Sequence, residues 1–422
     1  MFAQLILKEC RQTAKSIIYW LIVLILVIFF SSQLGNMDIA KKPKPGLESY
    51  GRYYSSNEQD IMKATLGYLV SEYTNGKYVT YPIGFYKMVT PDKEEQKRIG
   101  EIISETTGLD TKEEMEKALN AETEDSDAEA SDKKENHIIV LGGAPIAPSK
   151  TLTYDRFGEL MREVDHLLGG GSQYNKKHLK TNAATPKTYE QALQEYEDLM
   201  EKDHLTGGYA RLYSDYMGIM LGILPVFLAV TRGMRDRRSQ MRELIASRRA
   251  SSASIIVSRY ISMLIMLMLP VLLISCIPLM ECIQYAASGF HLDYLAFVKY
   301  SFGWLLPTIM IATAVGMVLT ELTDTALGVL VQLAWWFLAI FSSMSSMSGG
   351  MYGLDLVPRH NTEYNYAGFH AGFTQLAANR VLYAVISVLL IAVTVWIYSL
   401  KRKGRLDIRG KLLGNRKRKS QA

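Results

Sequence analysis

The sequence predicts an α-helical polytopic membrane protein with six transmembrane helices and a mixed α+β extracellular domain. Two observations lead to this class: apolar residues are concentrated in long runs, and basic residues are concentrated beside those runs. Residues 17–30, for example, are fourteen apolar residues in succession. The averages hide this separation, because 48% hydrophobic residues and a net charge of +5 are ordinary for a soluble protein. With 31 Gly, 12 Pro and 3 Cys in 422 residues, the chain is neither collagen-like nor a disulfide scaffold.

Six stretches are long and apolar enough to cross a bilayer, whose hydrocarbon core of about 30 Å requires roughly 20 helical residues. They are Ser16–Leu34, Leu212–Thr231, Ile255–Met280, Phe302–Thr320, Thr325–Ser345 and Val381–Leu400. In the third stretch, Pro270 and Pro278 predict a kink. The first stretch, residues 16–34, is interpreted as a retained transmembrane helix, because no small-x-small cleavage site follows Phe30.

Basic residues predict the orientation, since cytoplasmic loops are enriched in Lys and Arg. Three segments are basic: residues 1–15, the loop 232–254 and the tail 401–422, which has ten basic residues and one acid. With six spans all three lie on one side, so both termini are predicted to be cytoplasmic. A bacterial plasma membrane is the expected location, because the chain has no Asn-x-Ser/Thr glycosylation sequon.

The segment between the first two spans, residues 35–211, is predicted to be the extracellular domain. Over residues 34–212 there are 23 Lys and Arg against 31 Asp and Glu, so this part is acidic. Residue patterns predict helices at 57–73, 90–103, 154–168 and 189–202 and strands at 77–89 and 137–143. The small and charged residues 121–136 predict a disordered acidic loop.

No catalytic motif is recognisable in the chain, so it is not expected to be an enzyme. The four histidines of the outer domain form no metal-ligand pair, and there is no Gly-x-Ser-x-Gly sequence. The nearest approach to a nucleotide-binding loop, residues 404–412, lacks the Ser/Thr after Lys and follows a membrane helix. Binding of nucleic acid is disfavoured, because topology and contact with anionic lipid explain the basic face better.

The cytoplasmic segments are amphipathic. Residues 1–15 are predicted to form a lead helix, which either lies in the membrane interface or extends the first span. In the loop 232–254, apolar residues recur at helical spacing between arginines. These residues are Met234, Met241, Leu244 and Ile245. The pattern suits docking of another protein and covering of lipid equally well.

Charged residues are scarce within the predicted spans, and Gln332 is the main polar side chain that we expect to be buried there. It belongs to a stripe with Trp335 and Trp336, which we interpret as lining a substrate pathway. Because ion-coupled carriers use ionisable residues inside the membrane, a secondary transporter is disfavoured.

Five features, in this order, resemble the permease subunit of a bacterial ABC transporter of the ABC-2, or type V exporter-like, class. They are the lead FAQLILKECRQTAKS, the large insertion between spans one and two, the loop RDRRSQMRELIASRRASSASIIVSRY, the turn ELTDTALGVL and the outer segment PRHNTEY. The insertion, with LLGGGSQY at 167–174, is similar to those of Firmicutes members. The resemblance covers the membrane part of the chain and involves no catalytic signature.

The resemblance implies a permease without its own nucleotide site. Its expected partners are a cytoplasmic ABC ATPase subunit in two copies, which binds ATP and Mg, a second permease subunit, identical or different, and membrane lipid. The loop 232–254 would contain the coupling helix, seated in an ATPase cleft beside the lead helix. The implied ATPase-coupling residues are Arg235, Arg238, Met241, Arg242, Glu243, Leu244 and Ile245. No cofactor and no metal are expected on this chain.

The resemblance also implies an outer re-entrant segment, residues 348–378, with short helices that dip toward the membrane as an exit gate. Within it, residues 358–361 fit a simple turn with a hydrogen-bonding cap as well as a substrate contact. The leading hypothesis is ATP-driven export of a hydrophobic or amphipathic substrate, such as an antimicrobial peptide, a drug or a lipid. The alternative is a membrane-anchored surface receptor or scaffold whose extracellular domain binds a partner.

Overall fold

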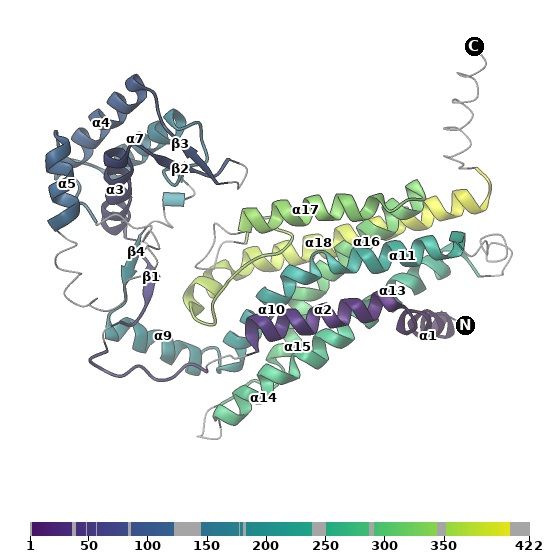
Figure 1. The fold of residues 1–422 in the computed structure, drawn as a ribbon. Coiled ribbons are helices and arrows are strands. Elements are labelled where there is room, and N and C mark those ends of the chain that lie inside the picture. Colours follow the sequence, from purple (N-terminus) through teal and green to yellow (C-terminus); the bar gives the residue numbers. More distant parts are fainter. Residues whose placement is uncertain are drawn as a thin grey trace, which may run out of the picture. The chain divides into compact units, whose positions relative to one another are not determined.

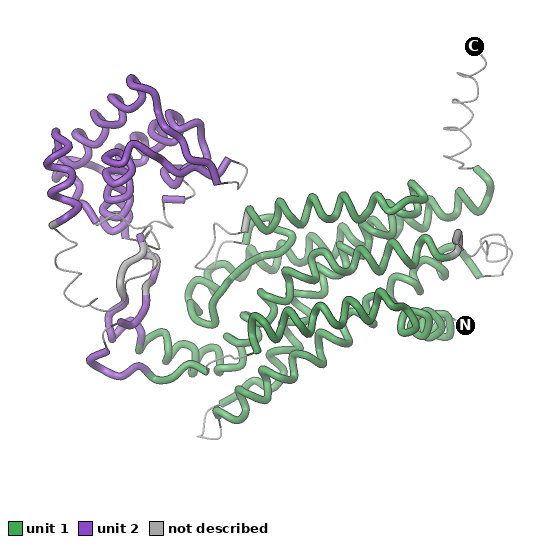
Figure 2. The backbone as a smooth tube through the Cα atoms, viewed as in Figure 1, with its two compact units in different colours: residues 1–42, 193–422 green, residues 43–192 purple. Residues whose placement is uncertain are grey.

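The computed structural model divides the chain into two compact units, which Figure 2 shows in different colours. Unit 1 comprises residues 1–42 and 193–422, and unit 2 comprises residues 43–192. The structure describes residues 2–35, 39–47, 49–55, 57–82, 86–121, 145–176, 178–179, 183–238, 250–286, 291–343 and 352–405. Most of these residues are helical, and the strands among them belong to unit 2 (Figure 1).

Unit 1 is built from long apolar helices that lie side by side (Figure 1). They are α1 (Phe2–Ala14), α2 (Ile17–Leu34), α10 (Thr206–Leu221), α11 (Leu224–Arg238), α13 (Ser252–Ile274), α14 (Cys276–Tyr285), α15 (Ala296–Tyr300), η4 (Ser301–Leu305), α16 (Leu306–Thr323), α17 (Leu327–Ser343) and α18 (Tyr366–Arg402), with α9 (Tyr189–Glu201) leading into the unit. In the described residues, four helical stretches are long and apolar enough to cross a membrane. A fifth results if α10 and α11, bent by 41°, form one span. The chain is therefore mostly helical, with the character of a multi-pass membrane protein.

Of the six spans expected from the sequence, four correspond to single helical stretches long and apolar enough to cross a membrane. These stretches are Ile17–Leu34, Ser252–Tyr285, Ala296–Thr323 and Tyr366–Arg402. The predicted stretch 212–231 is interrupted, because α10 ends at Leu221 and α11 begins at Leu224. The predicted stretch 325–345 appears as α17, a shorter apolar helix that begins only after the turn at 324–326.

One of these helices changes its hydrogen-bonding pattern inside the bundle. Residues Ser301–Leu305 form a π-helix within the continuous stretch Ala296–Thr323. Pro307 follows directly and has no N–H to donate to the carbonyl four residues earlier, which favours such a local change. Trp304 and Leu305 of the wider turn are buried in the core.

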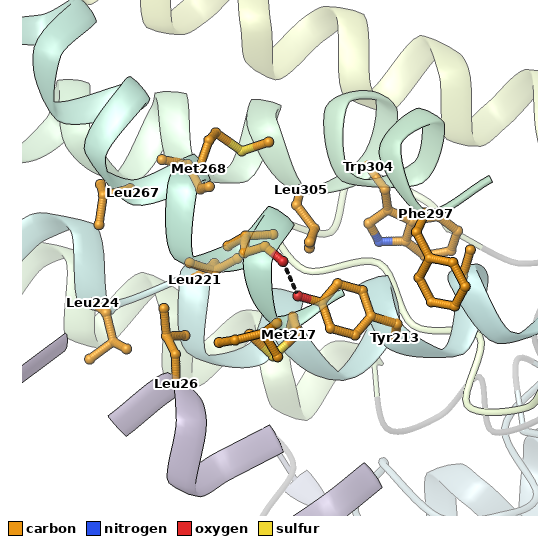
Figure 3. Close-up of a cluster of buried hydrophobic side chains, with 14 of the residues drawn as sticks. Leu26, Tyr213, Met217, Leu221, Leu224, Leu267, Met268, Phe297, Trp304 and Leu305 are labelled. Carbon is orange, nitrogen blue, oxygen red and sulfur yellow. Dashed lines mark hydrogen bonds between the residues drawn. The ribbon is translucent and has the colours of Figure 1, made fainter. Parts of the chain in front are cut away.

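The apolar core of unit 1 includes residues of α2, α10, α11, α13, α15 and η4, which Figure 3 shows gathered in one cluster. Tyr213 of α10 packs edge-on against Phe297 with 5.9 Å between ring centroids, and its hydroxyl donates a 2.6 Å hydrogen bond to the Val271 carbonyl. The stretch that contains α16 is central, because 72% of its apolar window is buried, against 28% for α2 and 33% for α18. The exposed apolar faces of α2 and α18 are typical of helices that contact lipid.

Unit 2 is also largely helical. Its core lies between α3 (Glu58–Asn75), α4 (Lys93–Thr107) and α7 (Tyr154–Leu167), with α5 (Lys112–Ala121) beside α3. Among its described residues the strands have three residues each: β1 (Arg52–Tyr54) pairs antiparallel with β4 (Ala184–Pro186), and β2 (Tyr78–Thr80) pairs antiparallel with β3 (Lys87–Val89). The described part thus has two short ladders where the sequence predicts a mixed α+β domain.

The helices predicted at 57–73 and 90–103 are present as α3 and α4, which end at Asn75 and Thr107, and both begin at capping residues. Asn57 accepts a hydrogen bond from the Gln59 N–H at the start of α3, and Asp92 forms a capping box with Glu95 at the start of α4. The strand-like run 77–89 is divided into β2 and β3 rather than forming one strand. The predicted strand 137–143 and the predicted acidic loop, except Ala121 at the end of α5, lie outside the described residues.

A buried carboxylate joins three parts of unit 2. Glu72 of α3 accepts hydrogen bonds from the Val79 N–H at 2.9 Å and from the hydroxyl of the fully buried Tyr174 at 2.5 Å. Burial raises the pKa of Glu72, although the hydrogen bonds from Tyr174 and Val79 oppose the shift. Glu72 therefore fixes the position of β2 and of the segment after α7.

Candidate functional sites in unit 1

The residues expected to couple to an ATPase lie at the edge of the described structure. Arg235 is exposed on the last turns of α11, and its Nη1 donates to Gln12 of α1 at 3.3 Å. Arg238 is the last residue of α11, and its side chain lies outside the described residues. The same holds for the rest of the predicted coupling residues, Met241, Arg242, Glu243, Leu244 and Ile245.

The helices on both sides of this loop are tied to the lead helix by one carboxylate. Glu9 of α1 pairs with Arg232 of α11 and lies 3.7 Å from Arg259 of α13. Gln12, one turn later, accepts a hydrogen bond from Arg232 at 3.1 Å. Because Arg232 is only 7% exposed, its charge depends on Glu9 for compensation. The ends of α1, α11 and α13 therefore form one polar surface, which we call the basic end.

The tail and the turn after α16 belong to the same basic end. Lys401 of α18 lies 3.7 Å from Glu321 in the last turn of α16 and 3.1 Å from Asp324, the residue that follows this helix. Arg402 donates a 2.7 Å hydrogen bond to the Ala250 carbonyl just before α13. Glu321 and Asp324 thus act as ion-pair partners of α18.

The predicted pathway residues Gln332, Trp335 and Trp336 lie along α17. Gln332 is fully buried and donates a 2.6 Å hydrogen bond to the Gly222 carbonyl, while Trp336 donates to the Ile219 carbonyl at 2.7 Å. Both carbonyls lie at the break between α10 and α11, where the helical hydrogen bonds are interrupted.

These contacts give Gln332 and Trp336 a role in stabilising the broken helix. A Cβ at Gly222 would lie 2.8 Å from the Trp336 ring, so only glycine permits this approach. Trp335 instead packs against Tyr383 of α18, with 5.9 Å between ring centroids. The Gln332 Oε1 atom is buried and has no hydrogen-bond partner among the described residues.

At the opposite end of the helices, residues 352–365 form an irregular segment between α17 and α18, which we call the 352–365 segment. It differs from the short helices expected for 348–378: residues 352–365 lack regular helix, and 366–378 are the first turns of the 37-residue helix α18. Residues 348–351 of the expected re-entrant segment lie outside the described residues. Asn365 caps the helix by accepting from the Gly368 N–H at 3.0 Å.

A buried arginine of α10 fixes one part of the 352–365 segment. Arg211 is fully buried and forms an ion pair with Asp203 at 2.8 Å. The same Nη2 donates to the carbonyls of Glu363, at 2.7 Å, and Tyr364, at 3.2 Å. A Cβ at Gly208 would lie 2.6 Å from the Glu363 carbonyl oxygen, which shows how closely the segment approaches α10.

One turn further along α10, an acid holds the middle of the segment. Asp215 is fully buried, and both of its carboxylate oxygens lie 2.9 Å from the Arg359 Nε. One oxygen also accepts the His360 N–H at 2.7 Å. His360 in turn contacts the Tyr352 hydroxyl at 2.9 Å. Residues 358–361 therefore form an internal ion-pair contact, beyond the simple turn considered from the sequence.

Side chains of α18 bind the first part of the segment. Asn379 donates to the Gly353 and Asp355 carbonyls at 2.9 and 3.0 Å, and the Tyr383 hydroxyl donates to the Leu354 carbonyl at 2.5 Å. Arg380 donates to the Asp355 and Leu356 carbonyls at 3.2 and 3.4 Å. Four successive carbonyls are therefore satisfied by one helix.

The sequence analysis missed these residues because of where it placed the ends of the spans. Arg211 and Arg380 each precede a predicted apolar stretch by one residue, so the predicted spans do not include them. In the structure both lie inside longer helices and are buried. The available signal was the polar sequence 358–365, which has to satisfy its backbone somewhere.

Comparisons with known proteins found no match, so a function has to be argued from the contacts described above. No protein-family model, no curated protein and no solved structure matches the chain. In the described residues no group of three or more His, Cys, Asp or Glu side chains could hold a metal ion. The candidate sites are thus the basic end and the 352–365 segment, both defined by ion pairs between helices.

Proposed function

We propose that the chain is the membrane-spanning permease subunit of an ATP-driven ABC transporter of the ABC-2 kind in a bacterial plasma membrane. The proposed passes are α2, α10 with α11, α13 with α14, α15 to α16, α17 and α18. At 17 residues, α17 would be about 25 Å long, which is short for a span but within the range that lipid accommodates. The proposed orientation has the basic end and both termini in the cytoplasm and unit 2 outside the cell, and the enrichment of cytoplasmic loops in Lys and Arg supports it.

The observation that carries the proposal is the joining of α1, α11 and α13 through Glu9, Arg232 and Arg259. These three helices meet at the ends of the loop that resembles a coupling helix. A force applied to that loop by an ATPase subunit is therefore transmitted to three helices together. ATP and Mg belong to this partner, which is present in two copies, and a second permease subunit completes the pathway.

The 352–365 segment supports export as the direction. In the proposed orientation it lies at the extracellular end, where an ion pair with α10 and hydrogen bonds from α10 and α18 hold it against the helices. Substrates with a hydrophobic or amphipathic character suit a route between apolar helices that has few polar side chains. The ATP-driven step would release this closure.

Co-purification tests the proposal directly. The tagged full-length protein, extracted from its own membrane, is expected to bring down an ATPase subunit with nucleotide-binding motifs, identified by mass spectrometry. Arg238→Glu with Leu244→Asp is expected to remove at least nine tenths of that subunit. A matched control, Lys117→Glu with Leu47→Asp, changes two exposed residues of unit 2 and should leave the yield unchanged. Purification of the chain without any ATPase would contradict the proposal.

A receptor or scaffold remains the second candidate because unit 2 has a hydrophobic core of its own. A unit with its own core can fold around a binding surface that does not involve the membrane helices. A secondary carrier would instead lose transport when an uncoupler is added to cells whose ATP is maintained, whereas an ATP-driven permease would not.

A further inference from the structure

Arg380 is a buried cation whose hydrogen bonds all go to neutral groups, while the carboxylate of Asp355 acts on it only from beyond ion-pair distance. Its side chain is 5% exposed, and in the described part of the chain it forms no ion pair. Its donors go to neutral oxygens only: Trp304 O, Thr308 Oγ1, Asp355 O, Leu356 O and Asn379 Oδ1. By contrast, the neighbouring Arg211 and Arg359 each have a carboxylate. A buried guanidinium that contacts only neutral acceptors is costly in a membrane protein, and such residues are candidates for functional sites.

The position of Arg380 along α18 corresponds to a lipid headgroup. From Leu400, the last residue before the basic end, Arg380 is 20 residues away, which is about 30 Å along a helix. This equals the thickness of the hydrocarbon core of a bilayer. In the proposed orientation, Arg380 therefore lies at the level of the phosphates of the outer leaflet.

The 352–365 segment occupies the donors that an anion would use. The carbonyl oxygens of Asp355 and Leu356 accept from the Arg380 Nη2, as oxygens of a phosphate or carboxylate would. These carbonyls are neutral, so an anionic group would bind the same guanidinium more strongly. Displacement of the segment by such a group would release the contacts that close this end.

We propose that Arg380 is the headgroup site for an anionic amphiphile, a molecule with a phosphate or carboxylate head and an apolar tail, which displaces the 352–365 segment from α18. The inference rests on the proposed function for its orientation, and it names the substrate class of that function. Thr308, which accepts from Arg380 at 2.7 Å and donates to the Leu356 carbonyl at 3.3 Å, is the residue placed to exchange partners when the segment moves.

Binding to the full-length protein in phosphatidylcholine nanodiscs, without an ATPase, tests the site. The probes are dodecyl phosphate, dodecanoate, uncharged dodecanol and inorganic phosphate, and the readout is intrinsic tryptophan fluorescence together with the melting temperature. Half-saturation is expected at a concentration at least tenfold lower for the two anionic amphiphiles than for dodecanol. Inorganic phosphate should bind at least tenfold more weakly than dodecyl phosphate, and equal binding of the two would overturn the assignment to an amphiphile.

Variants separate recognition of charge from support of the fold. Arg380→Gln should weaken dodecyl phosphate about tenfold and leave dodecanol unchanged, whereas Lys299→Gln, which removes an exposed cation paired with Asp293, should change neither. Asn379→Asp supplies a carboxylate where the amide oxygen now accepts from Arg380, so it should abolish the preference for anions. Because it also loses the amide that donates to the Gly353 and Asp355 carbonyls, its melting temperature and binding are compared with those of Asn379→Ala, which loses the same donors without adding a charge. An unchanged preference in Asn379→Asp would refute the site. That outcome would leave the ATPase co-purification untouched, so the two proposals fail separately.

Discussion

Arg211 shows how one side chain can hold a helix and a distant segment together. Its guanidinium pairs with the carboxylate of Asp203, which is close in sequence. It also donates hydrogen bonds to the carbonyls of Glu363 and Tyr364, which follow about 150 positions later in the chain. The attraction between Arg211 and Asp203 offsets the free-energy cost of burying them only while both are present, because a single buried charge costs several kcal/mol. Substitution of Arg211 is therefore costly mainly because it leaves the Asp203 carboxylate buried without its ion-pair partner.

Replacing Arg211 by methionine is expected to destabilise unit 1 by about 3–5 kcal/mol, since Asp203 is then buried without a partner. The double variant Arg211→Met with Asp203→Leu should recover part of this loss. Thermal unfolding of the purified protein in detergent measures both. A single variant within about 1 kcal/mol of the wild type would show that the pair is not needed for closure of the 352–365 segment.

The acid Glu72 in unit 2 gives a pH-dependent prediction. Burial raises the pKa of Glu72 in the folded protein above its unfolded value of about 4.3. Its contribution to stability is therefore greatest below that value and is lost as the pH rises through the folded pKa. Relative to the wild type, Glu72→Gln should gain resistance of unit 2 to pulse proteolysis between pH 4 and pH 7. Glu116→Gln, at an exposed position of α5, should show no such trend.

At the scale of elements, the long apolar helices could be predicted and their interruptions could not. Hydrophobic length alone locates α2, α13 and α18, because lipid-facing surface requires it. The break at Gly222 depends instead on Gln332 and Trp336 from another helix, a contact that local sequence does not encode. The candidate site was missed for the same reason: Asp215 and Arg359 meet only after folding.

The break between α10 and α11 should depend on the indole N–H of Trp336. Trp336→Phe removes the donor to the Ile219 carbonyl and is expected to cost about 1–3 kcal/mol, because a buried acceptor loses its partner. Trp335→Phe, which alters a residue that packs on Tyr383, is the matched control and should cost less. Equal losses in thermal unfolding would indicate that ring volume, rather than the hydrogen bond, stabilises the break.

The lead helix α1 should loosen when its carboxylate is neutralised. Glu9→Gln removes the carboxylate of α1 that pairs with Arg232 and lies near Arg259, so amide hydrogen exchange in residues 2–14 should increase by about tenfold or more. Lys8→Gln alters an exposed neighbour and should leave the exchange unchanged. Unchanged exchange in Glu9→Gln would mean that apolar contacts with α13 are sufficient to hold α1.

For the whole molecule, the division into two units suggests that unit 2 is dispensable for the fold of unit 1. Each has a separate hydrophobic core. Replacing residues 43–192 by a short Gly-Ser linker should therefore leave the melting temperature of unit 1 within a few degrees. Retained transport by this deletion would support the permease proposal, whereas loss of function with an intact unit 1 would favour the receptor alternative.

The order in which the ion pairs occur along the chain has a consequence for biosynthesis. Asp215 and its partner Arg359 are 144 residues apart, with most of the membrane helices between them. At roughly 5–20 residues per second, the ribosome reaches Arg359 only about 7–30 s after Asp215. During that interval α10 carries an acid without its partner at the insertion site. Assembly of unit 1 is thus completed from the C-terminal end, and chains released before Arg359 expose a charge that quality-control proteases can recognise.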